Sequence, residues 1–154
     1  MNIRPFRDAD QPAFRALNLA WIEKHFTIEP SDLHQLDKPR ETILSHGGAI
    51  LVADASGEVV GSIGVVPHGS ADRLEIVKMA VADAHRGRGI GRALLSAALD
   101  HARKQGAKQL WLESNTRLEA ATHLYRAAGF VELPRADYED TPYSRCNLQM
   151  ICDL

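Results

Sequence analysis

The hydrophobic pattern divides the chain into strands and helices that follow one another in a mixed order. Residues 2–7 carry Pro5 and suit an edge strand. Residues 49–53 and 58–66 flank a turn of Asp, Ala, Ser and Gly, which predicts a β-hairpin. Residues 74–81 are rich in Val, Ile and Leu and predict a further strand. The remaining strands are expected at residues 109–113, from Phe130 onward, and at residues 143–151.

Apolar positions spaced by three and four predict helices between these strands. The first helix follows Asp8 or Asp10, either of which can cap it. Residues 28–36 predict a turn into a second, short helix with Ser31 or Asp32 as its cap. The inward face of the first helix is expected at Phe14, Leu17, Ala20, Trp21 and Lys24.

Proline and glycine mark the limits of the other helices. Pro39 opens a third helix that ends at Gly47-Gly48. A long helix after Gly91 ends at Gly106, and a helix at residues 117–128 ends at Gly129. The order is a β-meander with early inserted helices and two late β–α units, which predicts a mixed α/β (α+β) fold in a single domain at residues 1–154. The apolar face of the long helix is expected at Leu94, Leu95, Ala98, Leu99 and Ala102.

Composition narrows the function classes. The chain has 154 residues and a formal net charge of −2, which argues against a general nucleic-acid binder because such domains are usually basic. No apolar run is long enough for a membrane span, and no secretory signal is visible. Cys146 and Cys152 are expected on one strand, too far apart for a disulfide, as reduced thiols of a cytoplasmic protein. The seven histidines lack the spacing of a metal site, so no metal is expected.

The junction between residues 74–81 and the long helix has the pattern of an anion site. Glycines at alternate positions lie among arginines, and a helix begins directly afterwards. Glycine lets the backbone approach a ligand, and the first turn of a helix offers free N–H groups and a positive dipole end. The alternative is a plain tight turn with solvated arginines. The turn consists of Arg86, Gly87, Arg88, Gly89, Ile90, Gly91 and Arg92.

Three motifs together resemble the GNAT N-acetyltransferase family. Residues 86–91 (RGRGIG) fit the pattern Arg/Gln-x-x-Gly-x-Gly/Ala between a strand and a helix, and residues 110–115 (LWLESN) and 124–130 (LYRAAGF) follow at matching separations. The resemblance covers nearly the whole chain. It implies a central mixed sheet of about six or seven strands flanked by helices, and acetyl-CoA as cosubstrate.

The resemblance also implies how acetyl-CoA would be held. Backbone N–H groups of residues 86–92 would bind the pyrophosphate. Main-chain groups of Met79, Ala80 and Val81 would pair with the pantetheine arm and polarise the thioester carbonyl. Asn115 would hydrogen-bond the pantetheine, and its alternative role is to cap the helix at Arg117.

Two residues are expected to carry the chemistry. Strand alternation places Glu75 as the single carboxylate on the face of Val77, Met79 and Val81, a poor place for a charge unless it is paired or used. The resemblance implies that Glu75 is the general base; the alternative is an exposed residue or a partner of Lys78 or Arg73.

Tyr125 is the second of these residues. The resemblance implies that it donates a proton to the departing thiolate of coenzyme A. Its alternative role is that of a core aromatic.

The acceptor pocket is expected between the early helices and the loop before the last strand. Glu29 is a candidate for an ammonium and Arg145 for a carboxylate; alternatively, Tyr143 and Arg145 only end the sheet. The predicted function is acetyl transfer to a primary amine of a small molecule or amino acid, without nucleic-acid or membrane partners and with a homodimer as a further expectation. The alternatives are a non-catalytic coenzyme-A-binding module and a protein-lysine or N-terminal acetyltransferase. The candidate lining residues are Trp21, His25, Phe26, Glu29, Tyr138, Tyr143 and Arg145.

Overall fold

A computed structural model describes residues 1–154, apart from the side chain of residue 71. Its centre is a seven-stranded sheet in the order β1-β2-β3-β4-β5-β7-β6, with β1 at one edge as predicted. All neighbouring strands are antiparallel except β4 and β5, which are parallel. The strands are β1 (Asn2–Pro5), β2 (Ala49–Ala55), β3 (Glu58–His68), β4 (Ser70–Val81), β5 (Gln109–Ser114), β6 (Val131–Glu132) and β7 (Leu148–Asp153).

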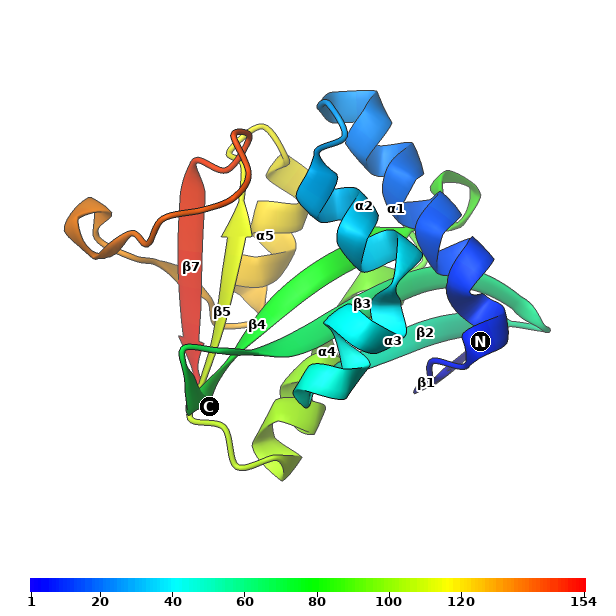
Figure 1. Ribbon diagram of the computed structural model, residues 1–154, viewed down its shortest axis with the longest axis horizontal. Coiled ribbons are helices and arrows are strands. Elements are labelled where there is room, and N and C mark those ends of the chain that lie inside the picture. Colours follow the sequence, from blue (N-terminus) through cyan, green and yellow to red (C-terminus); the bar gives the residue numbers. More distant parts are fainter.

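Helices cover both faces of the sheet (Figure 1). One core joins Phe14, Leu36 and Ile43 to the face of β2 under the early helices. A larger core on the opposite face includes buried side chains of the later helices, among them Leu94 and Tyr125. None of the described helices is long and apolar enough to cross a membrane. The helices are α1 (Gln11–His25), α2 (Pro30–Asp37), α3 (Pro39–Thr42), α4 (Ile90–Lys104) and α5 (Glu119–Ala127).

A β-bulge changes the facing of β4. The register with β3 shifts between Ser62 and Gly64, and Lys78 of the opposing strand has a φ of +50°. Before the bulge, Glu75 shares a face with Val77, which packs under the early helices. After it, Met79 and Val81 pack against the core of α4 and α5. The expectation that residues 75, 77, 79 and 81 share one face is therefore wrong, because the extra residue reverses the alternation.

The buried stripe of α1 also differs from its prediction. It consists of Phe14, Asn18 and Ile22, whereas Ala20 and Lys24 are exposed. Asn18 is fully buried because its Nδ2 donates to the Phe14 carbonyl at 2.9 Å and to Ser62 Oγ at 3.2 Å. A pattern of apolar residues treats asparagine as a surface residue. The predicted face therefore passes through Leu17 and Trp21, one position before the buried Asn18 and Ile22.

Two further boundaries are corrected by side-chain contacts. Glu29, rather than Ser31 or Asp32, is the N-cap of α2, and Asp32 Oδ2 accepts the Glu29 N–H at 2.9 Å. The last strand begins at Leu148 instead of residue 143, so Cys146 precedes the strand and only Cys152 lies on it. Both cysteines are free.

Candidate active site

A cleft opens where β4 and β5 separate. Their pairing ends at Glu75 and Trp111, although β4 continues to Val81 and β5 to Ser114. Figure 1 shows the two strands diverging beyond this point. The resulting cleft has a volume of about 650 Å³ and extends from the turn before α4, along β4, to the loop that precedes β7. It presents a stretch of β4 main chain without β5 alongside.

The turn before α4 forms one end of the cleft. Gly87 and Gly89 have φ values of +76° and +78°, a region that residues with a Cβ avoid. Gly89 is the N-cap of α4, and no described side chain caps this helix. The N–H groups of its first turn are consequently free for a ligand. Of the residues predicted here, Arg86, Gly87, Gly89, Ile90 and Gly91 line the cleft, whereas the exposed Arg88 and Arg92 do not.

Close packing fixes the middle of the cleft. A Cβ on Gly91 would lie 3.3 Å from Leu124 Cδ2 and 3.5 Å from Met79 Cε, so α4 approaches β4 closely at this glycine. Tyr125 is buried beside them, and its hydroxyl lies 3.8 Å from Met79 Sδ. Burial raises the pKa of Tyr125 to about 12, which keeps the phenol protonated at neutral pH.

Glu75 lies where the two strands part. Its side chain is 19 % exposed, and its Oε2 lies 3.3 Å from His68 Nδ1. Burial raises the pKa of Glu75 to about 7, against the opposing effect of His68. Neither partner considered from the sequence contacts it, because Lys78 pairs with Asp32 and Arg73 approaches Glu139. A carboxyl group that titrates near neutrality is suited to acid–base chemistry.

Glu113 is a site residue that sequence reasoning missed. It lies on β5 and lines the cleft with Glu75, whose pKa it helps to raise. Burial raises the pKa of Glu113 as well, although its Oε2 accepts a hydrogen bond from Thr141 at 3.0 Å. Its Oε1 is buried and has no hydrogen-bond partner among the described residues. Glu113 lies two residues after Trp111, the register partner of Glu75, so the pairing of β4 with β5 is what brings it to the site.

A buried cluster of alternating charges supports the end of the cleft next to the loop before β7. Asp32 is fully buried and accepts hydrogen bonds from Lys78 Nζ at 2.7 Å and from Arg145 Nη1 at 2.8 Å. Arg145 also pairs with Glu29 at 3.3 Å, and Ser144 donates to the same carboxylate. The charges predicted to bind substrate, Glu29 and Arg145, are thus balanced within the protein.

Asn115 is tied to the same segment. Its Nδ2 donates to the Arg145 carbonyl at 2.6 Å, and its Oδ1 accepts the Arg117 N–H at 2.8 Å. The helix that follows begins only at Glu119, so Asn115 closes a local turn instead of capping α5 directly. Asn115 nevertheless lines the cleft.

Aromatic residues line the same end of the cleft. Trp21, His25, Phe26 and Tyr143 line the cleft, and the Arg145 guanidinium lies 4.5 Å from the centre of the Tyr143 ring. Two residues predicted from the sequence do not line the cleft. Glu29 forms an ion pair with Arg145, and the Tyr138 hydroxyl donates to Glu132 Oε1 at 2.9 Å. The structure brings together Glu75, Met79, Ala80, Val81, Asn115, Tyr125, Trp21, His25, Tyr143 and Arg145 around one cleft.

Comparison with known proteins gives a consistent result. Residues 10–130 match the model of the acetyltransferase (GNAT) family. The uncharacterized N-acetyltransferase YjgM of Escherichia coli (strain K12) is 31% identical over 134 residues, covering 86% of this chain and 78% of that protein. Streptothricin acetyltransferase of Streptomyces lavendulae is 43% identical over 76 residues, covering 49% of this chain and 40% of that protein. For six other curated relatives, the matched segment spans 44–52% of their length.

Solved structures share the fold. A GNAT-family acetyltransferase from Staphylococcus aureus Mu50 has a TM-score of 0.89 at 20% identity, covering 99% of this chain and 98% of that chain. Other structures of this fold include complexes with coenzyme A or acetyl-CoA. This likeness and the seven-stranded sheet confirm the α/β fold class and the sheet of about six or seven strands that the family resemblance implies.

Proposed function

Because the chain belongs to the acetyltransferase (GNAT) family, we propose that it transfers the acetyl group of acetyl-CoA directly to a primary amine of a small molecule or amino acid. The observation that carries the proposal is the single cleft that joins an uncapped helix start to a carboxyl group with a pKa of about 7. In this proposal, residues 1–154 form one N-acetyltransferase domain.

The turn before α4 fits the pyrophosphate of coenzyme A. A Cβ at Gly87 or Gly89 would meet nothing within 4 Å, so the main chain there is open to a ligand. The free N–H groups of the first helical turn favour an anion. Arg86, paired with Asp83 at 2.7 Å, stands beside the turn. Residues 86–92 would hold the pyrophosphate, and the arginine side chains add positive charge.

The β4 main chain fits the pantetheine arm. Beyond Glu75, β4 has no ladder partner on its β5 side within the described residues. An extended amide-bearing arm can add to such an edge as a strand would. Residues Met79, Ala80 and Val81 would supply these hydrogen bonds, and one N–H would polarise the thioester carbonyl. Acetyl-CoA supplies the activated acetyl group when it is bound.

The chain's own residues supply the two proton transfers. Glu75 accepts a proton from the substrate ammonium, and the resulting free amine forms the amide bond. Tyr125 donates its phenolic proton to the sulfur that leaves. The nitrogen loses its second proton as the tetrahedral intermediate collapses, and this proton restores the phenol of Tyr125, so no covalent enzyme intermediate is needed.

Three observations support a small cationic amine as acceptor. Glu75 and Glu113 both line the cleft, so a positive substrate group is favoured there. Aromatic side chains enclose the entrance and suit a compact ligand. The similarity to streptothricin acetyltransferase agrees with a small-molecule acceptor. The proposal includes a cytoplasmic location, which agrees with the two free cysteines. It also includes a homodimer and no nucleic-acid or membrane partner.

The proposal is tested by combining binding and turnover on one sample. Calorimetry with acetyl-CoA should give one saturable site, and a panel of small amines, amino acids and peptides should give amine-dependent release of coenzyme A. Binding without release for any acceptor would instead indicate a coenzyme-A-binding module. Clear preference for peptides would move the acceptor to the protein class.

Substitution of Gly89 tests the pyrophosphate site. At a φ of +78°, Gly89→Ala adds about 1–2 kcal/mol of strain and displaces the turn, so the Kd for acetyl-CoA should rise about 5- to 30-fold. Gly57→Ala is the matched control, because Gly57 has a φ of +92° and open space but lies in the β2–β3 turn. Equal Kd values for Gly89→Ala and Gly57→Ala would contradict this site.

Substitution of Tyr125 tests the proton donor. Tyr125→Phe keeps the buried ring and removes the hydroxyl, so kcat should fall about 10- to 100-fold while the Kd for acetyl-CoA stays near the parent value. Steady-state kinetics and calorimetry measure the two quantities. A parental kcat would leave Tyr125 with a packing role only.

A further inference from the structure

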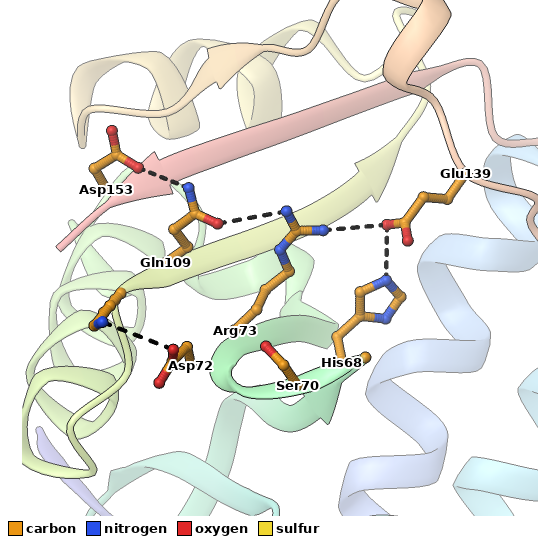
Figure 2. Close-up of a pocket in the computed structure, with 9 residues that line it drawn as sticks. His68, Ser70, Asp72, Arg73, Gln109, Glu139 and Asp153 are labelled. Carbon is orange, nitrogen blue, oxygen red and sulfur yellow. Dashed lines mark hydrogen bonds and ion pairs between the residues drawn. The ribbon is translucent and has the colours of Figure 1, made fainter.

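His68 lies between two cavities of the protein. Glu75 lines the cleft described above, whereas His68 lines a second cavity of about 510 Å³ at the start of β4. The two side chains approach each other at 3.3 Å, between Glu75 Oε2 and His68 Nδ1. The other ring nitrogen, Nε2, lies 2.9 Å from Glu139 Oε2 (Figure 2). The imidazole thus joins a carboxyl group in the cleft to one in the second cavity.

The orientation of the His68 ring is fixed from several sides. The ring stacks on Trp111 with centroids 4.2 Å apart and an interplanar angle of 10°. Gly69 follows in a left-handed conformation, φ +76°, which turns the chain directly into β4. Stacking restricts the ring to a plane from which Nδ1 reaches Glu75 and Nε2 reaches Glu139. This arrangement holds both contacts at once.

Glu139 is also held in place. Buried Gln149 of β7 accepts the Glu139 N–H at 2.8 Å and donates to its carbonyl at 2.7 Å. Arg73 Nη1 lies 3.5 Å from Glu139 Oε2, and Figure 2 shows both side chains directed at the same cavity as His68. The Glu139 side chain is 44 % exposed, so it can exchange protons with water.

We propose that His68 relays the proton that Glu75 removes from the substrate amine to Glu139 and the solvent of the second cavity. This inference rests on the proposed function. Glu75 gives the proton to His68 Nδ1, Nε2–H passes its own proton to the Glu139 carboxylate, and water removes it. After the products leave, Nε2 takes a proton from water through Glu139, and Nδ1 releases its proton through Glu75 to the water of the reopened cleft, which restores the tautomer. Imidazole suits this role because it accepts and donates protons near neutral pH.

The relay gives the proton on Glu75 a route to solvent while substrates fill the cleft. When the pantetheine arm and the amine fill the cleft, Glu75 is separated from solvent on that side, and its proton needs another exit. The charged groups that face His68 are Glu75 and Arg73 of β4, Glu113 of β5 and Glu139 of the loop before β7.

Kinetics of His68 variants test the relay. His68→Gln keeps hydrogen-bonding capacity but cannot carry a proton, so kcat at neutral pH should fall about 10-fold, with an unchanged KM for acetyl-CoA. The deficit should shrink toward about pH 9, where hydroxide replaces the relay. Added imidazole should restore kcat in His68→Ala. His46→Gln, at an exposed histidine outside both cavities, should match the parent.

The outcomes separate this inference from the proposed function. A parent without amine-dependent release of coenzyme A overturns the function itself. An active parent whose His68→Gln variant has parental kcat and pH profile, or whose His68→Ala variant is not rescued by imidazole, overturns the relay alone. If the His68 variants do not fold, Glu139→Gln decides: a lower kcat with unchanged KM supports the relay, and a parental kcat overturns it.

Discussion

Glu75→Gln is expected to lower kcat by about 100- to 10,000-fold while leaving the Kd for acetyl-CoA unchanged. The amide has the shape of the carboxyl group but cannot accept a proton from the amine. Glu75 lies beyond the stretch proposed to hold the pantetheine, so cosubstrate binding does not depend on its charge. Steady-state kinetics with calorimetry on the same protein measures both effects.

The pH dependence gives the Glu75 prediction a second readout. The base must be ionised, and burial raises the pKa of Glu75 to about 7. Activity should therefore rise as the pH rises through about 7 and then level off, and Glu75→Gln should lose this limb. Because the pKa of Glu75 is raised in the folded state, the protein loses stability as the pH rises from about 4.5 to 7, so the variant should be at least as stable as the parent at neutral pH.

A matched control separates this effect from loss of one acidic side chain. Glu58→Gln alters an exposed glutamate in the β2–β3 turn region and should leave kcat and its pH profile unchanged. If Glu75→Gln retained parental turnover across the pH range, another group would have to be the base. Glu113, with its raised pKa, would then be examined first.

Asp32→Ala is expected to destabilise the fold by about 3–5 kcal/mol. The substitution leaves buried Lys78, and Arg145 beside it, without the carboxylate that accepts their hydrogen bonds. It also removes the acceptor for the Glu29 N–H at the start of α2. Chemical denaturation measures the change in the free energy of unfolding.

Asp37 provides the control on the same helix. Its ion pair with Arg15 is exposed, so Asp37→Ala should cost only about 0–1 kcal/mol. A cost for Asp32→Ala no larger than that of Asp37→Ala would contradict the buried cluster.

Acid titration offers a further check on Asp32. Burial opposes its ionisation, but hydrogen bonds from Arg145 and Lys78 outweigh this and lower the pKa of Asp32 to about 2. The stability that the ionised group contributes is present above about pH 4 and is lost as the pH falls toward 2. The parent should therefore lose more stability than Asp32→Ala over this interval.

Much of the fold followed from local signals. A glycine-containing turn indicates the hairpin, glycines mark the ends of α4 and α5, and short apolar runs indicate β2, β3 and β5. The family resemblance drawn from the three motifs is confirmed by the family match. The glycine turn was recognisable because glycine, the strand before it and the helix after it are all local in sequence.

What the sequence did not reveal depends on contacts between distant residues. The bulge at Lys78 reverses the facing of β4 and was hidden by an apolar alternation that continues through it. Asn18 and Asp32 look like surface residues, and only Ser62, Lys78 and Arg145 explain their burial. Glu139 reaches His68 across 71 positions, a separation that no local pattern encodes.

The site residues divide in the same way. Glu75 and Tyr125 were proposed from spacing and resemblance, and their roles remain predictions for the experiments above. Glu113 and His68 could be identified only from the positions of β3, β4 and β5 in the sheet. Their role depends on Glu75, which His68 contacts and whose pKa Glu113 helps to raise.

The most direct test of the central claim follows the acetyl group by mass spectrometry. Protein is mixed with isotopically labelled acetyl-CoA, first alone and then with an active amine. The direct-transfer account predicts an unlabelled protein in both cases and label on the amine nitrogen, in keeping with burial that raises the pKa of the Cys146 thiol to about 11. Label on the protein before amine is added, or no labelled amine at all, would contradict it.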